Sequence, residues 1–270
     1  MQAATRVGLL IGSSRTGGNG AGLAVWLRQL LEDRLNAPGA AHPVELVPVD
    51  PRVAPHPLGP VVDGARLPSQ VPDAAGYGAP GVRAWSRLAA GCAGLAVLSP
   101  EYNGGYPGEL KNALDHLYRE WAAKPVLLVT YGGGGGLRCQ AQLRGVLEAL
   151  RMRVVPEPVG IRLPAAYTGG SERVSPAPAH GFPGFLEPYV GAVHGGADRL
   201  REMLLEKPAG SQWCAASRRI AARMLTADMA CSDARRCIPI ALYSGHMHAS
   251  RLLASSSTAQ YTDCQDSTKA

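Results

Sequence analysis

Three short segments of this sequence combine glycines with polar side chains in patterns that suit ligand binding. The first, residues 12–20 (GSSRTGGNG), has glycines that leave backbone N–H groups accessible, and it adds the hydroxyls of Ser13 and Ser14 and the guanidinium of Arg15. Ahead of a helix, this donor set predicts a phosphate site, although a flexible turn with a capping serine fits equally well. The segment is not a Walker loop and lacks the Gly-x-Gly-x-x-Gly fingerprint of dinucleotide-binding proteins.

The second segment, residues 100–108 (PEYNGGYPG), suits a flat heterocycle. Two prolines stiffen a turn whose backbone amides can meet the edge of a ring, while Tyr102 or Tyr106 can lie against or beside it. Glu101 is the obvious candidate for an acid or base. A glutamate beside a proline at a strand end is more often a surface or interface carboxylate, and we favour that interpretation.

The third segment, residues 131–136 (YGGGGG), offers bare backbone again. Five consecutive glycines are entropically costly unless something approaches the main chain closely, so a loop facing a ligand is favoured over a linker. Its N–H groups could stabilise negative charge on a reduced ring. Tyr131 could pack under that ring or belong to the core, and the sequence favours neither.

The elements that must position these segments alternate between short β-rich runs and longer helical patterns, which is typical of a parallel α/β sheet. We expect strands at 7–11, 44–49, 95–98, 126–130 and 153–158, and helices at 22–35, 82–90, 107–121, 137–151 and 197–206. Residues 50–81 and 165–185 read as loops. Each of the three segments directly follows a strand, so all three should meet at one edge of the sheet.

Composition narrows the possible environments. The chain has 270 residues, of which 46% are hydrophobic, yet no run approaches the roughly 20 apolar residues of a membrane helix. The first apolar run is too short for a signal peptide, so a cytoplasmic protein that contacts no membrane is expected. Residues 1–206 hold 19 Lys/Arg and 17 Asp/Glu, while residues 207–270 hold 8 and 4. The scattered basic residues of the tail do not predict a nucleic-acid partner.

The six cysteines show no disulfide framework. Cys231, Cys237, His246 and His248 only loosely imitate a metal cluster, because no Cys-x-x-Cys pair is present and the two histidines lie two residues apart. No metal site is predicted.

With these motifs in hand, residues 6–163 resemble the NAD(P)H-dependent FMN reductase family of flavodoxin-like flavoproteins, which includes quinone and azo-dye reductases. The resemblance is carried by GSSR at 12–15, RAWS at 83–86, SPEYN at 99–103, YPGELKNALDHL at 106–117, KP at 124–125 and the glycine loop. It implies a doubly wound α/β fold, with a five-stranded parallel sheet in the order 2-1-3-4-5 and helices on both faces. This domain would cover residues 1–206. Residues 207–270 would be an atypical tail, disordered or partly helical.

The resemblance also implies a flavoprotein oxidoreductase with bound FMN. A hydride from NADPH or NADH would pass through the flavin to a small acceptor such as a quinone, an azo compound, a metal ion or free flavin. The FMN phosphate would be held by Ser13, Ser14, Arg15, Gly18, Asn19 and Gly20; the isoalloxazine by Pro100, Glu101, Tyr102, Asn103 and Gly104; and its other edge by Tyr131, Gly132, Gly133 and Gly134. No catalytic side chain is expected, because the flavin does the chemistry.

The resemblance further implies a homodimer or homotetramer. Lys111, Asn112, Asp115 and His116 share one helix and could suggest a catalytic group. In such proteins this helix packs on a neighbouring subunit, so a polar interface or helix surface is the favoured interpretation.

Two alternatives remain open at this point. One is a flavin-binding module without turnover, such as an electron carrier or a redox sensor. The other is a nucleotide-sugar or NAD-binding domain in which Asp50, at the end of the second strand, would hold a ribose.

Overall fold

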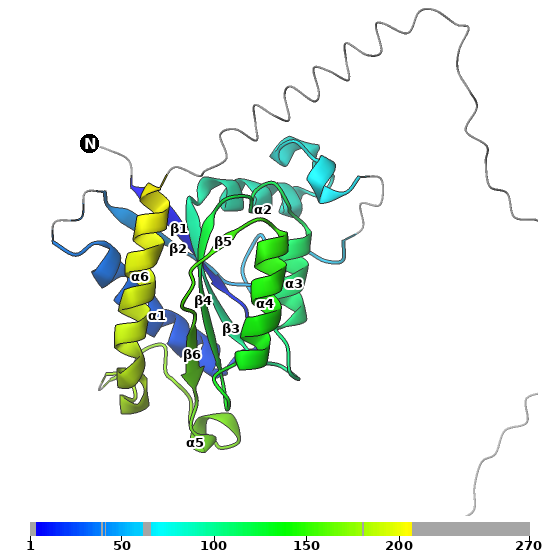
Figure 1. Ribbon diagram of the computed structural model, residues 1–270. Coiled ribbons are helices and arrows are strands. Elements are labelled where there is room, and N and C mark those ends of the chain that lie inside the picture. Colours follow the sequence, from blue (N-terminus) through cyan, green and yellow to red (C-terminus); the bar gives the residue numbers. More distant parts are fainter. Residues whose placement is uncertain (1–3, 39, 41, 62–65, 180, 207–270) are drawn as a thin grey trace, which may run out of the picture. The chain divides into compact units, whose positions relative to one another are not determined.

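The computed structural model describes residues 4–38, 40, 42–61, 66–179 and 181–206, and the tail predicted at 207–270 lies outside these residues. Its parallel strands are β1 (Thr5–Ile11), β2 (Val44–Val49), β3 (Gly94–Pro100), β4 (Pro125–Gly132), β5 (Arg153–Val154) and β6 (Val159–Arg162). They form a sheet in the order β2-β1-β3-β4-β5, in which β6 also pairs with β4 (Figure 1). The doubly wound order implied by the resemblance is therefore confirmed.

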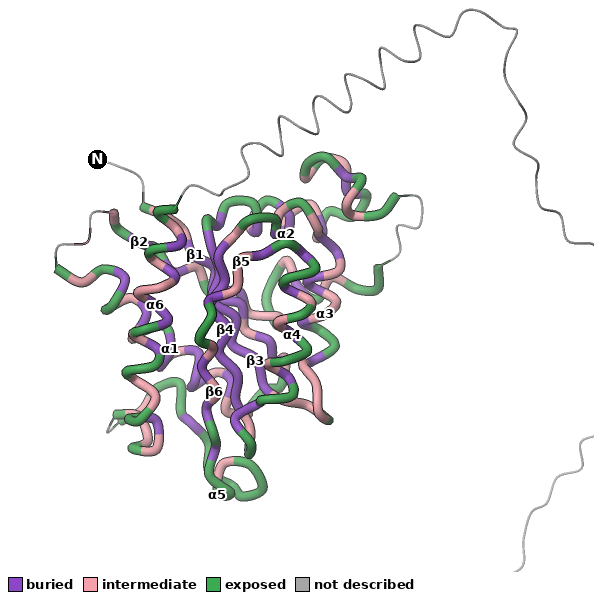
Figure 2. Tube along the Cα trace, viewed as in Figure 1, coloured by how far each residue is buried: buried purple, intermediate pink, exposed green. Residues whose placement is uncertain are grey.

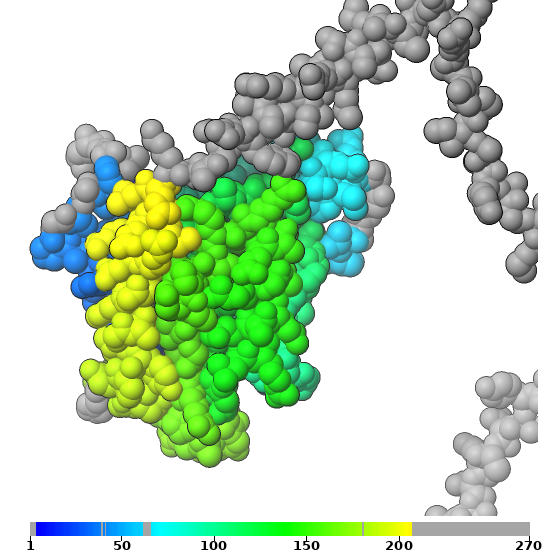
Figure 3. Space-filling view, in the orientation of Figure 1, coloured from blue at the N-terminus to red at the C-terminus, as the bar shows by residue number. Residues whose placement is uncertain are grey.

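Helices cover both faces of this sheet. They are α1 (Asn19–Leu35), α2 (Pro80–Gly91), α3 (Gly108–Asp115), α4 (Leu137–Ala149), α5 (Ala165–Thr168) and α6 (Val190–Leu205), with 3₁₀ turns at Pro68–Gln70, Ala74–Gly76 and Gly184–Tyr189. The side chains of α1 and α6 form one hydrophobic cluster with the sheet, and those of α2, α3 and α4 form another. In this view α6 and α4 lie on either side of the edge formed by β5 and β6, and the yellow surface of α6 adjoins the green surface of the segments before it (Figure 3).

The central strands are apolar along their whole length because both of their faces are covered. Every residue of β3 is buried, and alternate side chains enter opposite clusters: Leu98 joins the α1/α6 cluster and Val97 the other (Figure 2). This burial is typical of a parallel sheet with helices on both sides. It fixes the carboxyl ends of β1, β3 and β4, where the three glycine-containing segments begin.

The last strand differs from the prediction of a single strand at 153–158. Two short strands replace it: β5 pairs with the start of β4, and β6 pairs with its end. Pro156 and Pro158 lie between them, and a proline has no N–H group to donate to the ladder. After this interruption, β6 pairs with the end of β4. The chain that follows β6 therefore emerges at the carboxyl edge of the sheet, where the three segments lie.

The helix predicted at 107–121 is shorter than expected, because α3 ends at Asp115. Two indole N–H groups donate hydrogen bonds to backbone carbonyls in its last turn: Trp85 Nε1 to the Ala113 carbonyl at 2.8 Å, and Trp121 Nε1 to the Leu114 carbonyl at 3.1 Å. In a longer helix, these carbonyls would accept hydrogen bonds from backbone N–H groups of the next turn. The segment predicted as loop at 165–185 also contains α5, and α6 begins at Val190 rather than at 197.

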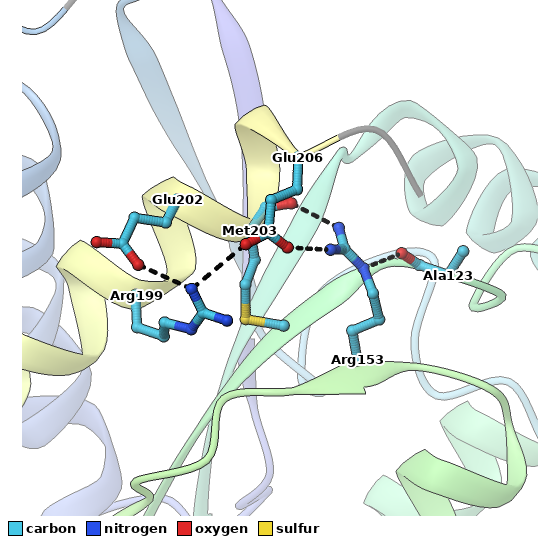
Figure 4. A network of polar contacts seen from close by, with 6 residues as sticks. All are labelled: Ala123, Arg153, Arg199, Glu202, Met203 and Glu206. Carbon is cyan, nitrogen blue, oxygen red and sulfur yellow. Dashed lines mark hydrogen bonds and ion pairs between the residues drawn. The ribbon is translucent and has the colours of Figure 1, made fainter. Parts of the chain in front are cut away.

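The end of α6 is anchored to the sheet by Arg153 of β5 (Figure 4). Its guanidinium donates to the carbonyls of Ala123 and Met203 and pairs with Glu206 at 3.0 Å. Arg199 pairs with Glu202 at 2.8 Å and with Glu206 at 3.3 Å. Beyond Glu206 the chain lies outside the described residues.

Candidate functional site

The three segments meet, as expected, around one cavity of about 430 Å³ at the carboxyl edge of the sheet. The β1–α1 loop, the β3–α3 loop, the β4–α4 loop and the chain after β6 each supply one wall. The cavity is lined by Ser13, Arg15, Thr16, Gly17, Gly18, Asn19, Gly20, Pro100, Glu101, Tyr102, Tyr131, Gly132, Gly133, Leu163, Tyr167, Thr168 and Arg173. Carboxyl ends of parallel strands are where ligands bind in open α/β sheets.

The β1–α1 loop presents donors to the cavity. Ser13 is buried at its base, Arg15 is exposed, and Gly17 has a positive φ of 70° that turns the chain into α1. No side chain among the described residues caps the start of α1 at Gly18. The first N–H groups of α1 thus lack a side-chain acceptor, and together with Arg15 they form an anion-binding arrangement.

Tyr102 joins this loop to the β3–α3 loop. Its ring lies under the guanidinium of Arg15, with 4.2 Å between the Arg15 Cζ atom and the ring centre, and its hydroxyl lies 2.7 Å from the Ser13 hydroxyl. A cation over an aromatic face is attracted by the ring quadrupole. Tyr102 therefore orients the Arg15 guanidinium as well as lining the cavity.

Glu101 joins the β3–α3 loop to the β4–α4 loop. Its carboxylate accepts hydrogen bonds from the backbone N–H of Arg138 at 3.1 Å and from Arg138 Nε at 3.0 Å. Arg138 lies in the first turn of α4, so the carboxylate both pairs with a cation and caps the helix. These contacts support a role in holding the two loops together rather than in proton transfer.

The glycines of the β4–α4 loop divide into two kinds. Gly135 and Gly136 have positive φ values of 77° and 73°, and a Cβ atom at Gly136 would lie 2.8 Å from Thr130 Cβ, so these two glycines form the turn itself. Gly133 and Gly134 are exposed, and a Cβ atom at Gly134 would meet nothing within 4 Å. Glycine is not required by packing at Gly134, and bare backbone at Gly133 faces the cavity.

Tyr131 is buried at the base of the cavity and belongs to the hydrophobic core, although it also lines the cavity. Burial raises the pKa of its phenol well above the ordinary value. The hydroxyl is therefore neutral at physiological pH and available as a hydrogen-bond donor beside Ser13. A Cβ atom at Gly20 would lie only 2.8 Å from that hydroxyl, so the close approach of α1 requires glycine there.

The wall formed after β6 was not predicted, because residues 165–185 read only as loop. Asn19 holds it in place: its Nδ2 donates to the Tyr167 carbonyl at 2.8 Å, and its Oδ1 accepts from the Val174 N–H at 2.9 Å. This brings Thr168 and Arg173 to the cavity. A signal for this wall was available, since any chain following a parallel strand emerges at the same edge.

Some predicted residues lie away from the cavity. Ser14, Asn103, Gly104 and Gly134 are not among its lining residues. Asn103 and Gly104, both with positive φ, form the tip of the β3–α3 turn, which is closed by hydrogen bonds between the backbones of Tyr102 and Gly105.

The polar residues of α3 do not form a catalytic group at the cavity. Lys111 pairs with Asp115 at 2.5 Å, Asn112 donates to the Gly59 carbonyl, and His116 is buried with Nδ1 at 2.8 Å from the Asn112 carbonyl. None of the four lines the cavity.

The described residues contain no group of three or more His, Cys, Asp or Glu side chains that could hold a metal ion. The four tail residues weighed as metal ligands lie outside the described part. None of the described helices is long and apolar enough to cross a membrane.

Comparison with known proteins places this site in a family. Residues 5–162 match the family model of the NADPH-dependent FMN reductases. An NAD(P)H-dependent FMN reductase of Schizosaccharomyces pombe is 52% identical over 82 residues, which cover 30% of this chain and 41% of the relative. Another from a Nectria species is 34% identical over 155 residues, which cover 57% of this chain and 73% of the relative.

Solved structures show the same fold. The flavoenzyme FerB of Paracoccus denitrificans, an NAD(P)H:(acceptor) oxidoreductase, superposes with a TM-score of 0.50 at 20% identity, covering 74% of this chain and 97% of FerB. The family match spans more than half of the chain and includes the loops after β1, β3 and β4. The chain belongs to the NADPH-dependent FMN reductase family.

Proposed function

We propose that the chain binds FMN in the cavity at the carboxyl edge of the sheet and catalyses the NAD(P)H-dependent reduction of a small acceptor. The observation that carries the proposal is that one cavity joins an anion-binding end, at residues 13–19, to an end lined by Pro100, Gly132 and Gly133. Its relatives are named as reductases of this type. The stretch matched to the Schizosaccharomyces pombe reductase covers less than half of that relative, so the activity of the whole protein is part of this proposal.

The residues present fit the chemistry of FMN. A phosphate monoester needs a cation and several N–H or O–H donors, which Arg15, Ser13 and the start of α1 offer. A flat ring with polar edges needs backbone donors and an apolar neighbour. Gly132 and Gly133 expose main chain without side chains, and Pro100 and Leu163 provide apolar surface.

Each group of residues then has a part in the reaction. Ser13, Arg15 and the amides from Ser14 to Gly20 hold the phosphate, with Tyr102 orienting Arg15. Residues 100–102 hold one edge of the ring, and residues 131–133 hold the other. FMN bound there would supply the hydride-transfer and two-electron chemistry that links NAD(P)H to the acceptor. The protein contributes position and charge stabilisation, and Glu101 remains bonded to Arg138.

The proposal has finer parts that follow the resemblance. The hydride donor is NADPH or NADH. The acceptor is a quinone, an azo compound, a metal ion or free flavin, and the working unit is a homodimer or homotetramer in the cytoplasm.

Steady-state turnover tests the proposed activity. NADPH oxidation is followed with benzoquinone as acceptor, first with protein stripped of flavin and then after FMN is restored. We expect oxidation that requires both FMN and quinone. Protein that binds FMN, accepts electrons from another source and oxidises neither NADPH nor NADH would instead be a carrier without turnover, and the proposal would be wrong.

A further inference from the structure

The wall formed after β6 brings a second cation to the proposed FMN cavity. The charged side chains that line the cavity are those of Arg15, Glu101 and Arg173. The Glu101 carboxylate is paired with the guanidinium of Arg138 at 2.9 Å, so its charge is balanced. Arg15 comes from the β1–α1 loop, whereas Arg173 comes from the wall. Two segments far apart in the sequence therefore supply positive charge to one cavity.

The β1–α1 loop itself offers no second cation. Gly17 and Gly18 have no side chains, and Asn19 uses both ends of its amide to bind the wall. Its Nδ2 donates to the Tyr167 carbonyl at 2.8 Å, and its Oδ1 accepts from the Val174 N–H at 2.9 Å. At these three positions the loop can offer a phosphate N–H groups but no charge.

The contacts of Asn19 fix the position of Arg173. Val174, the next residue, is 1% exposed and belongs to the hydrophobic cluster of α1 and α6. A Cβ atom at Gly22 would lie 2.0 Å from the Val174 carbonyl oxygen, so the backbone of the wall touches α1. Arg173 is thus held beside the first turn of α1, where the helix has N–H groups without intrahelical partners.

The guanidinium of Arg173 is ordered by its own segment. One terminal nitrogen donates to the carbonyls of Gly170 at 2.8 Å and Glu172 at 2.6 Å. Within the described part of the chain, Nε and the other terminal nitrogen make no hydrogen bond, and the side chain has no carboxylate partner. Ordering a long side chain costs conformational entropy, and a side chain that is already restrained loses less of it on binding a ligand.

We propose that Arg173 is a second cation for the phosphate of FMN and that Asn19 is the residue that positions it. The inference rests on the proposed FMN-binding function. A phosphate monoester carries a charge of about −1.5 to −2 at pH 7, which two guanidinium groups match. Tyr102 orients Arg15 from the β3–α3 loop, and Asn19 holds Arg173 through the wall. The wall thereby contributes to the preference of the site for FMN over riboflavin, which has no phosphate.

Titration of the flavin-free protein with FMN and with riboflavin, followed by flavin fluorescence, tests the role of Arg173. Arg173→Ala should raise the dissociation constant of FMN about tenfold, because charge-assisted hydrogen bonds to the phosphate are lost, and should leave that of riboflavin unchanged. Arg173→Lys keeps the charge without the paired donors and should recover part of the loss. The matched control is Arg87→Ala, which removes an exposed arginine of α2 that does not line the cavity, and it should change neither constant.

A double-mutant cycle tests the positioning role of Asn19. Asn19→Ala frees the wall and should weaken FMN binding more than riboflavin binding. In the Arg173→Ala background the same substitution should have little further effect on the ratio of the two dissociation constants, because the group that Asn19 positions is gone. The same change of this ratio in both backgrounds would show that Asn19 acts independently of Arg173, and the positioning role would be wrong.

Failure of this inference can be distinguished from failure of the proposed function. Wild-type protein that binds FMN and oxidises NADPH, together with an unchanged FMN dissociation constant in Arg173→Ala, would overturn the assignment of Arg173 and leave the proposed function intact. An equal rise for FMN and riboflavin in that variant would also overturn it, since the phosphate would not be involved. Wild-type protein that binds no FMN would refute the proposed function itself, and this inference with it.

Discussion

The guanidinium of Arg15 lies over the ring of Tyr102, with 4.2 Å between the Cζ atom and the ring centre. The contact joins the β1–α1 loop to the β3–α3 loop, and the Tyr102 hydroxyl adds a second link through Ser13 at 2.7 Å. Through Tyr102, the phosphate end and the ring end of the proposed flavin site are in direct contact. A change at Tyr102 should consequently affect phosphate binding as well as ring binding.

Replacing Tyr102 by leucine tests this coupling. The variant loses both the platform under Arg15 and the hydroxyl contact, which together are worth roughly 1–3 kcal/mol. We expect the dissociation constant of FMN, measured by fluorescence titration, to rise about tenfold or more, with a smaller rise for riboflavin. Tyr102→Phe keeps the platform and should lose only a few-fold. Equal losses for FMN and riboflavin would show that Tyr102 has no influence on the phosphate end.

Arg15→Ala removes the cation itself. Hydrogen bonds to charged groups are worth roughly 1.5–3 kcal/mol, and the exposure of Arg15 places the effect near the lower end, so we expect FMN affinity to fall roughly tenfold. Riboflavin affinity and the thermal midpoint of the flavin-free protein should hardly change, as in the control Arg87→Ala. An unchanged FMN affinity would contradict the placement of the phosphate.

Glu101→Gln tests the link between the β3–α3 and β4–α4 loops. The amide keeps an acceptor for the Arg138 N–H but loses the ion pair with its guanidinium at 2.9 Å. We expect FMN to dissociate a few times faster, while the rate of flavin reduction by NADPH keeps its pH profile. Arg138→Ala should have a similar effect, because it removes the same ion pair. A pH profile that changes with Glu101→Gln alone would indicate a proton-transfer role that we do not assign.

Gly22→Ala tests the wall formed after β6. A Cβ atom at Gly22 would lie 2.0 Å from the Val174 carbonyl oxygen, so α1 and this wall must separate. We expect a loss of roughly 1–3 kcal/mol in the free energy of unfolding together with weaker FMN binding. Gly145→Ala on α4, where a Cβ atom meets nothing within 4 Å, should instead stabilise by up to about 1 kcal/mol. Stabilisation by both substitutions would mean that residue 174 does not pack here.

His56 predicts how stability depends on pH. The ring is buried edge-on against Trp85 at 4.8 Å, and its Nε2 has no hydrogen-bond partner among the described residues. Burial, with a smaller contribution from His116, lowers the pKa of His56 below its ordinary 6.5. As the pH falls below 6.5, the unfolded chain therefore binds more protons at His56 than the folded protein does. The free energy of unfolding should keep its full value above that pH and decrease below it.

Urea unfolding of the wild type and of His56→Leu at pH 7.5, 6.5 and 5.5 measures this effect. The loss of stability on acidification should be smaller in the variant, because the titrating group is gone. The same loss in both proteins would assign the pH dependence to other groups.

Much of the fold and part of the site could be predicted from the sequence. Wholly apolar runs such as 95–98 mark central strands, and glycine-rich segments directly after them must meet at one edge. What could not be predicted depends on contacts between distant residues. Asn19 secures a wall that begins 148 positions later, at Tyr167, and the end of α3 is set by the indoles of Trp85 and Trp121. Local sequence patterns do not indicate which distant residues will be in contact.

The central claim is that this chain is an FMN enzyme reduced by NAD(P)H, and the absorption spectrum of the purified, FMN-reconstituted protein tests it most directly. Under anaerobic conditions the oxidised flavin should show its visible absorption bands, which NADPH should bleach and benzoquinone should restore. A protein that cannot be loaded with FMN, or whose flavin stays oxidised in excess NADPH and NADH, would contradict the account.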